Sequence, residues 1–298
     1  MVTPFDEHAN RANEDGYHNQ RVNTHSDLVS LGIIRDLYQN CEALRADLDA
    51  GEVGFWINRP NPWGRKRNTD FLIARPLAGS IQAKKRPRIL GQLGVAGIGA
   101  HPDPKAVRVI GEHKSIVTAH RNRSARHDDL DHLYQDGNAK SPNTILFATV
   151  MIGTAPWYLN VADGVKNFFA RWDRDSQGRR RKKVIDEGRF AKEVIPRLRK
   201  NDEKLMDDYI AAVSENTERD IEASFELFCK GLPVRSNVSA TSPGFDGLLV
   251  VPVHYDNINA SRVDRNNEIA KRFTLDIDRD YQTLLTRICA RYVRLYGK

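Results

Sequence analysis

A glutamate and a lysine separated by one residue, Glu112 and Lys114, have the clearest capacity for chemistry in this sequence. They follow the apolar, β-branched run 106–111, which predicts a strand. Side chains alternate between the two faces of a strand, so both residues would point to the same side. A carboxylate can hold Mg²⁺, and an ammonium group can orient water or stabilise charge that builds at phosphorus. With one more acidic residue nearby, the pair would suffice for metal-dependent phosphodiester hydrolysis, although charged residues also alternate on many exposed strands.

The residues after this pair predict a strand–helix–strand unit. A polar, helix-prone segment reaches about Tyr134, and residues 143–153 form a long apolar run with β-branched side chains. Such a run is typical of a strand that is buried on both faces. Ligand sites in open α/β sheets lie at the carboxyl ends of the strands. The Glu-x-Lys pair stands at that end of the first strand.

The stretch 109–121, Val-Ile-Gly-Glu-His-Lys-Ser-Ile-Val-Thr-Ala-His-Arg, resembles the PD-(D/E)xK nuclease superfamily, and within it the type II restriction endonucleases. The likeness lies in the Glu-x-Lys followed by a Thr-x-His-basic step, and it covers about residues 90–155. It implies an α/β fold with a mixed central sheet flanked by helices, to which we expect a helical C-terminal elaboration to be added. It also implies that Glu112 is an acidic ligand of Mg²⁺ and Lys114 the catalytic lysine.

The first acidic metal ligand implied by the resemblance has two candidates. Asp103 belongs to a literal Pro-Asp, but it stands nine positions before Glu112, which leaves little room for two strands and a turn. Asp70 opens a strand-like run 42 positions before Glu112, which requires an insertion. We prefer Asp103, with the glycine-rich stretch 91–101 as the preceding strand, and keep Asp70 as the alternative. Each also has a plain explanation, Asp103 as a turn residue and Asp70 as a surface charge.

The charge of the chain favours a polyanionic partner. Its formal net charge is +7 and its pI is about 9.3, with basic clusters at 64–67, 84–88, 121–126 and 179–183. Separate clusters could follow a phosphate backbone, or they could be solvated loops. We expect contacts with double-stranded DNA from His120, Arg121, Arg123, Arg179, Arg180, Arg181, Lys182 and Lys183.

Composition places the chain among globular proteins that have no membrane segment. No apolar run is long enough to cross a bilayer, and the polar N-terminus has no signal-peptide pattern. Cys41, Cys229 and Cys289 stand far apart in the sequence without metal-site spacing, which favours a reducing compartment. We therefore expect a cytoplasmic protein.

The order of segments predicts one elaborated domain. Residues 1–22 are polar and predict a disordered tail, followed by a single nuclease domain over 23–298. Within it we expect the core at about 64–155 and a helical elaboration at about 186–231. Further expected elements are a helix over 25–50, loops over 52–63, a strand over 247–254 and a helix over about 278–296.

Together these features predict a Mg²⁺-dependent endonuclease of double-stranded DNA, of the type II restriction class. Cleavage of a symmetric site favours a homodimer whose two-fold axis matches that of the DNA. Two alternatives stay open. One is a non-catalytic nucleic-acid-binding protein whose basic clusters supply the affinity, and the other is a PD-(D/E)xK nuclease of repair or phage defence.

Overall fold

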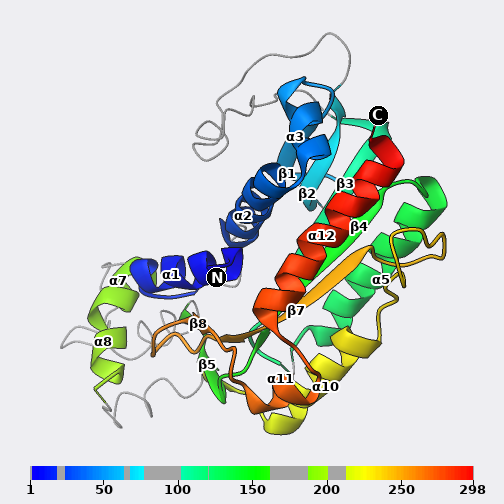
Figure 1. The fold of residues 1–298 in the computed structure, drawn as a ribbon. Helices are drawn as coiled ribbons and strands as arrows, with labels where there is room; N and C mark the ends of the chain where they lie inside the picture. The colour runs from blue at the N-terminus through cyan, green and yellow to red at the C-terminus, as the bar shows by residue number, and fades with distance from the viewer. Residues whose placement is uncertain are drawn as a thin grey trace.

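A mixed sheet of six strands forms the centre of the computed structural model, which describes residues 2–18, 24–63, 68–76, 102–119, 121–161, 187–200 and 213–297. The strand order is β1-β2-β3-β4-β7-β8 (Figure 1). This arrangement confirms the α/β class with a mixed central sheet. The strands are β1 (Gly54–Pro60), β2 (Asn68–Pro76), β3 (Pro102–Ile116), β4 (Ile145–Gly153), β7 (Gly247–His254) and β8 (Arg262–Val263).

The three central strands run parallel, and the outer strands run antiparallel to their neighbours. β3 pairs with β4, and β4 pairs with β7, in parallel registers. The crossover from β3 to β4 passes through helix α5 (Arg123–Lys140), as the sequence predicts. All nine residues of β4 are buried, because helices cover both faces of the sheet there. β1 is a correction, since the sequence predicted loops over 52–63.

Helices pack on both faces of the sheet and enclose two apolar cores. One face carries α2 (Thr24–Asn40), α3 (Glu42–Asp49) and α12 (Ile277–Tyr296); the other carries α5 and α10 (Glu218–Lys230) (Figure 1). Alternation along β3 feeds both cores, so that Val109 packs with the first group and Ile110 with the second. Glu112 and Lys114 are two and four positions after Ile110, so they lie on the same face of the strand as Ile110. Both therefore face the side of α5.

The N-terminal segment is ordered, so the prediction of a disordered tail over 1–22 is wrong for its helical part. Helix α1 (Pro4–Asp15) begins with a capping box between Thr3 and Asp6, and Pro4 occupies its first turn. Phe5 is fully buried and joins the core beside α2 and α12. A mostly polar sequence thus contributes a helix because its few apolar residues recur on one face.

The predicted helix over 25–50 is divided at Cys41, which adopts an extended conformation between α2 and α3. Cys41 is bonded to Cys289 of α12, with 5.4 Å between their Cα atoms. The expectation that the cysteines are separate is wrong for this pair, because two helices distant in the sequence pack together on the sheet. The cysteine pattern therefore no longer supports a reducing compartment.

The remaining described elements lie beyond the carboxyl ends of β4 and β7. A small sheet of β5 (Trp157–Leu159) and β6 (Val213–Glu215) lies there, as does α11 (Glu268–Arg272). Helices α7 (Glu187–Glu193) and α8 (Ile195–Leu198) pack beside α1 (Figure 1). Within the described ranges, no helix has the length and apolar character needed to cross a membrane.

Candidate active site

Asp70 and Glu112 face each other across two neighbouring strands. The antiparallel register pairs Phe71 with Gly111, so the next pair along the strands is Asp70 with Glu112. The backbone N–H of His113 donates to Asp70 Oδ2 at 2.8 Å, which fixes this carboxylate beside β3. Directly opposed residues of an antiparallel pair have their Cβ atoms about 5 Å apart on one face, where like charges are destabilising. Two carboxylates in this position suggest a site for a cation.

Lys114 lies next to these carboxylates and is itself nearly buried. Its Nζ donates to Glu112 Oε1, and it lies 3.7 Å from Asp129 Oδ2 of α5. The Lys114 side chain is 9% exposed and the Glu112 side chain 14%, so the pair is mostly shielded from water yet still reaches the surface. The Glu-x-Lys is therefore not a pair of ordinary surface charges. Its charges interact at low effective dielectric, where they are strong.

The electrostatics of the cluster are unfavourable for its carboxylates. Burial, followed by repulsion from Asp70, raises the pKa of Glu112 to about 7, and Lys114 opposes this shift. Burial also raises the pKa of Asp70, which Lys114 and the His113 N–H lower in part. The single ammonium of Lys114 is shared by several carboxyl groups. Ionising all of these carboxyl groups in the folded protein therefore costs free energy. A bound cation would remove that cost.

His113, between the two charged residues, points to the opposite face of the sheet. Burial lowers its pKa to about 3, so its ring is neutral. Its Nε2 lies 3.0 Å from Ser30 Oγ, which donates to the carbonyl of Asp70, and its Nδ1 lies 2.8 Å from Thr149 Oγ1. Because the Ser30 proton is already donated, Nε2 carries the ring proton and Nδ1 accepts from Thr149. This chain of hydrogen bonds fixes the strand segment that carries Glu112.

The donor set fits Mg²⁺ better than a metal that is held only by protein ligands. Within the described ranges, no three His, Cys, Asp or Glu side chains are arranged to hold a metal ion. Mg²⁺ commonly keeps several waters and binds through one or two carboxylates together with substrate phosphates. Asp70 and Glu112 supply two such carboxylates, so these residues are compatible with that ion.

The strand register places the backbone of Asp103 far along β3 from Glu112, which favours Asp70 over Asp103 as the first acidic ligand. Asp103 belongs to the same strand, next to Pro102, and the register pairs Pro102 with Pro76. The five steps along β2 from Phe71 to Pro76 span about 17 Å at a rise of about 3.3 Å per residue. Carboxylates that share an ion lie within about 5 Å.

Two further acidic residues near the site were not predicted. Asp129 from α5 approaches Lys114 and also lies 3.5 Å from Arg126. Asp27 of α2 repels Asp70, and its Oδ1 is buried with no hydrogen-bond partner among the described residues. Burial raises the pKa of Asp27. The helical position of Asp129 could have indicated its proximity, since α5 covers β3, whereas no sequence signal brings α2 to β2.

The predicted DNA-contacting residues have different outcomes. Arg121 is exposed at the start of the crossover, whereas Arg123 is partly buried and pairs with Asp220 at 3.3 Å. His120 lies outside the described residues. So does the run Arg179, Arg180, Arg181, Lys182 and Lys183.

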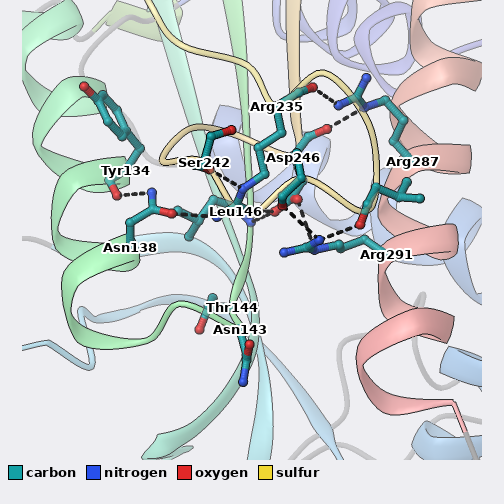
Figure 2. Close-up of polar contacts among 12 residues, drawn as sticks. Tyr134, Asn138, Asn143, Thr144, Leu146, Arg235, Ser242, Asp246, Arg287 and Arg291 are labelled. Atoms are coloured by element: carbon teal, nitrogen blue, oxygen red, sulfur yellow. Dashed lines mark hydrogen bonds and ion pairs between the residues drawn. The ribbon is translucent and has the colours of Figure 1, made fainter.

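A second charged cluster lies at the amino ends of β4 and β7 (Figure 2). Asp246 is buried and accepts from Arg235 at 2.6 Å and from the Leu146 N–H at 2.9 Å. Figure 2 shows Arg287 and Arg291, from α12, reaching toward the same aspartate; Arg287 Nε donates to the Asp246 carbonyl at 2.7 Å. These contacts hold the segment before β7 against α12. They are internal, so this cluster is structural.

Comparison of the chain with family models, curated proteins and solved structures finds no match.

Proposed function

We propose that this protein is a Mg²⁺-dependent endonuclease that hydrolyses phosphodiester bonds of double-stranded DNA. The observation that carries the proposal is the position of Asp70 directly across from Glu112, with Lys114 bonded to Glu112 and all three near the carboxyl end of a parallel strand. Two opposed carboxylates and a buried ammonium are costly unless a cation and a negatively charged substrate complete them. Phosphodiester hydrolysis uses both.

In this proposal, Asp70 and Glu112 hold the metal ion, which when bound supplies Lewis acidity to the phosphate. Lys114 orients the attacking water and stabilises the negative charge that develops on the phosphate oxygens. Asp129 helps to position the lysine, because its carboxylate lies 3.7 Å from Nζ. His113 holds Asp70 in place through its backbone N–H.

The proposed biological setting is restriction of foreign DNA by a PD-(D/E)xK-type enzyme acting as a homodimer in the cytoplasm. Its support is the Glu-x-Lys at the end of a strand in a mixed sheet, together with the basic clusters of the sequence. Arg121 and the run at 179–183 are proposed to contact phosphates. Whether Cys41 and Cys289 are oxidised in the cell tests the location, since the cytoplasm keeps most cysteines reduced.

The test is cleavage of supercoiled plasmid by the purified protein in Mg²⁺ and in EDTA. Wild type should cleave only in Mg²⁺, while Asp70→Asn and Glu112→Gln should not cleave. Asp128→Asn is the matched control, because Asp128 lies on α5 with its side chain 67% exposed. Asp103→Asn should remain active, which separates the two candidate aspartates.

DNA binding in Ca²⁺ distinguishes a catalytic role from a binding role. Glu112→Gln should still bind DNA, because affinity comes mainly from phosphate contacts. A folded wild type that binds DNA but never cleaves it in Mg²⁺ would instead indicate a non-catalytic binding protein. Full activity of Glu112→Gln would overturn the assignment of this site.

A further inference from the structure

A cavity of about 390 Å³ lies at the far end of β3 from the candidate active site. Its walls come from the end of β2, the start of β3, the turn after α5 and the last turn of α12. Its size is in the range of sites that bind small molecules, about 300–1,000 Å³. The residues that line it include Arg75, Arg108, Lys140, Asn143 and Tyr296.

The charged residues that line this cavity, among those that the structure describes, are the cations Arg75, Arg108 and Lys140. Arg75 is 57% exposed and forms a loose ion pair with Glu52, at 3.8 Å. Lys140 is 47% exposed, lies 3.5 Å from Asp136 and donates to the Trp63 carbonyl at 3.1 Å, which leaves one of its three N–H groups. Both cations therefore retain donors for an anion that enters the cavity.

The inner wall is rigid and already formed. Arg108 is nearly buried, pairs with Asp47 and lies over the Tyr296 ring at 4.7 Å. Tyr296 donates in turn to the Asn143 carbonyl at 2.6 Å. A wall whose side chains are already in place favours binding, because binding then needs no free energy to order those side chains.

We propose that this cavity binds a phosphate monoester carried on a larger organic group. Two exposed cations at the mouth suit the doubly charged phosphate, and the Arg108–Tyr296 wall suits a flat or polar group attached to it. A phosphate ion alone would leave most of the volume empty. The ligand is either a free nucleotide or the 5′-phosphorylated end of a DNA strand, which share this chemistry. The site is independent of the proposed nuclease activity.

The test is calorimetric titration of the full-length protein in EDTA with AMP, adenosine, inorganic phosphate and a short oligonucleotide with or without a 5′ phosphate. We expect AMP or the phosphorylated oligonucleotide to bind with a Kd below about 1 mM, and adenosine at least about tenfold more weakly. The double variant Arg75→Gln/Lys140→Gln should bind about tenfold or more weakly than wild type, because hydrogen bonds to charged groups are lost.

Lys271→Gln is the matched control, since this lysine is 50% exposed and paired with Glu268 on a distant helix. It should bind like wild type, and the melting temperature of each variant shows that it is folded. Tighter binding of the phosphorylated oligonucleotide than of AMP identifies a DNA end as the source, and the reverse identifies a free nucleotide. The proposal is overturned if neither AMP nor the phosphorylated oligonucleotide binds, or if inorganic phosphate binds as tightly as both of them. It is also overturned if adenosine and the unphosphorylated oligonucleotide bind as tightly as their phosphorylated forms, or if the double variant binds like wild type.

Discussion

The two ends of the central sheet hold charged clusters of opposite design. Near the carboxyl end of β3, one lysine, Lys114, lies among the carboxylates of Asp70, Glu112 and others. At the amino ends of β4 and β7, one aspartate, Asp246, lies among arginines such as Arg235 (Figure 2). The first cluster has an excess of negative charge with few hydrogen bonds among its members. The second has an excess of positive charge, but its guanidinium groups donate widely to backbone carbonyls.

This difference is the reason for treating one cluster as structural and for proposing a function for the other. A buried charge is tolerated when hydrogen bonds satisfy it, as they do around Asp246. Arg235 donates to Asp246, to the Ser242 carbonyl and to Asn138. Around Lys114, Glu112 accepts from the lysine, and Asp70 accepts from the His113 N–H and the Ser26 side chain, while Asp70 and Glu112 still repel each other. Removing the acid Asp246 should therefore destabilise the folded protein, whereas removing an acid beside Lys114 should stabilise it.

The largest expected effect is at the amino end. Asp246→Ala should lower the free energy of unfolding by about 3–5 kcal/mol, because it leaves the buried Arg235 and the Leu146 N–H without a partner. Urea denaturation followed by circular dichroism measures the change. Asp128→Asn, at an exposed position, should be close to wild type. A loss under about 1 kcal/mol would contradict the structural role.

The next effect concerns the lone lysine at the carboxyl end. Lys114→Ala should reduce the rate of DNA cleavage about 100-fold, which is comparable to losing one electrostatic stabiliser. Lys114→Arg should restore little, because a planar guanidinium differs in shape and does not give up its proton. Single-turnover cleavage in Mg²⁺ measures both rates. An arginine variant with the wild-type rate would mean that the position supplies only positive charge.

The third prediction uses the pH dependence of stability without metal. The pKa of Glu112 is raised to about 7, so the folded protein keeps this proton at a pH where the unfolded chain has lost it. This contribution to stability is present below about pH 4.5 and is lost as the pH rises to about 7. From pH 5 to pH 8, wild type should lose about 2 kcal/mol more than Glu112→Gln. Parallel profiles for the two proteins would contradict the raised pKa.

The smallest expected effect is stabilisation by the ion itself. At ten times its Kd, Ca²⁺ should stabilise wild type by about 1.4 kcal/mol, because it binds only the folded state. Glu112→Gln and Asp70→Asn should gain much less, since each lacks one carboxylate. Thermal melting with and without Ca²⁺ at pH 8 measures the gain. An equal shift in all three proteins would place the ion elsewhere.

Much of the fold could be predicted from local sequence patterns. The apolar run at 143–153 and the strand at 247–254 predict β4 and β7 because a strand buried on both faces needs apolar residues at every position. The last helix, α12, follows from its periodic apolar residues. The pairing of strands distant in the sequence, such as β4 with β7, has no local signal.

The candidate site was predicted in part. Glu112 and Lys114 could be found because both lie on one strand, where alternation fixes their common face. Asp70 was ranked second because 42 positions separate it from Glu112, and sequence distance says nothing about the register of β2 on β3. Asp27 and Asp129 come from helices on opposite faces, so only the packed structure brings them near.

The bond between Cys41 and Cys289 makes a closed ring of most of the chain, since the two residues are 248 positions apart. One cut in the backbone anywhere within that ring would leave a single covalent molecule, and only a reducing agent would release the two pieces. In the chain-entropy model, closing such a long ring reduces the conformational entropy of the unfolded chain and so raises the free energy of unfolding by about 5 kcal/mol. Proteolysed protein should therefore migrate as one band on a non-reducing gel and as two on a reducing gel.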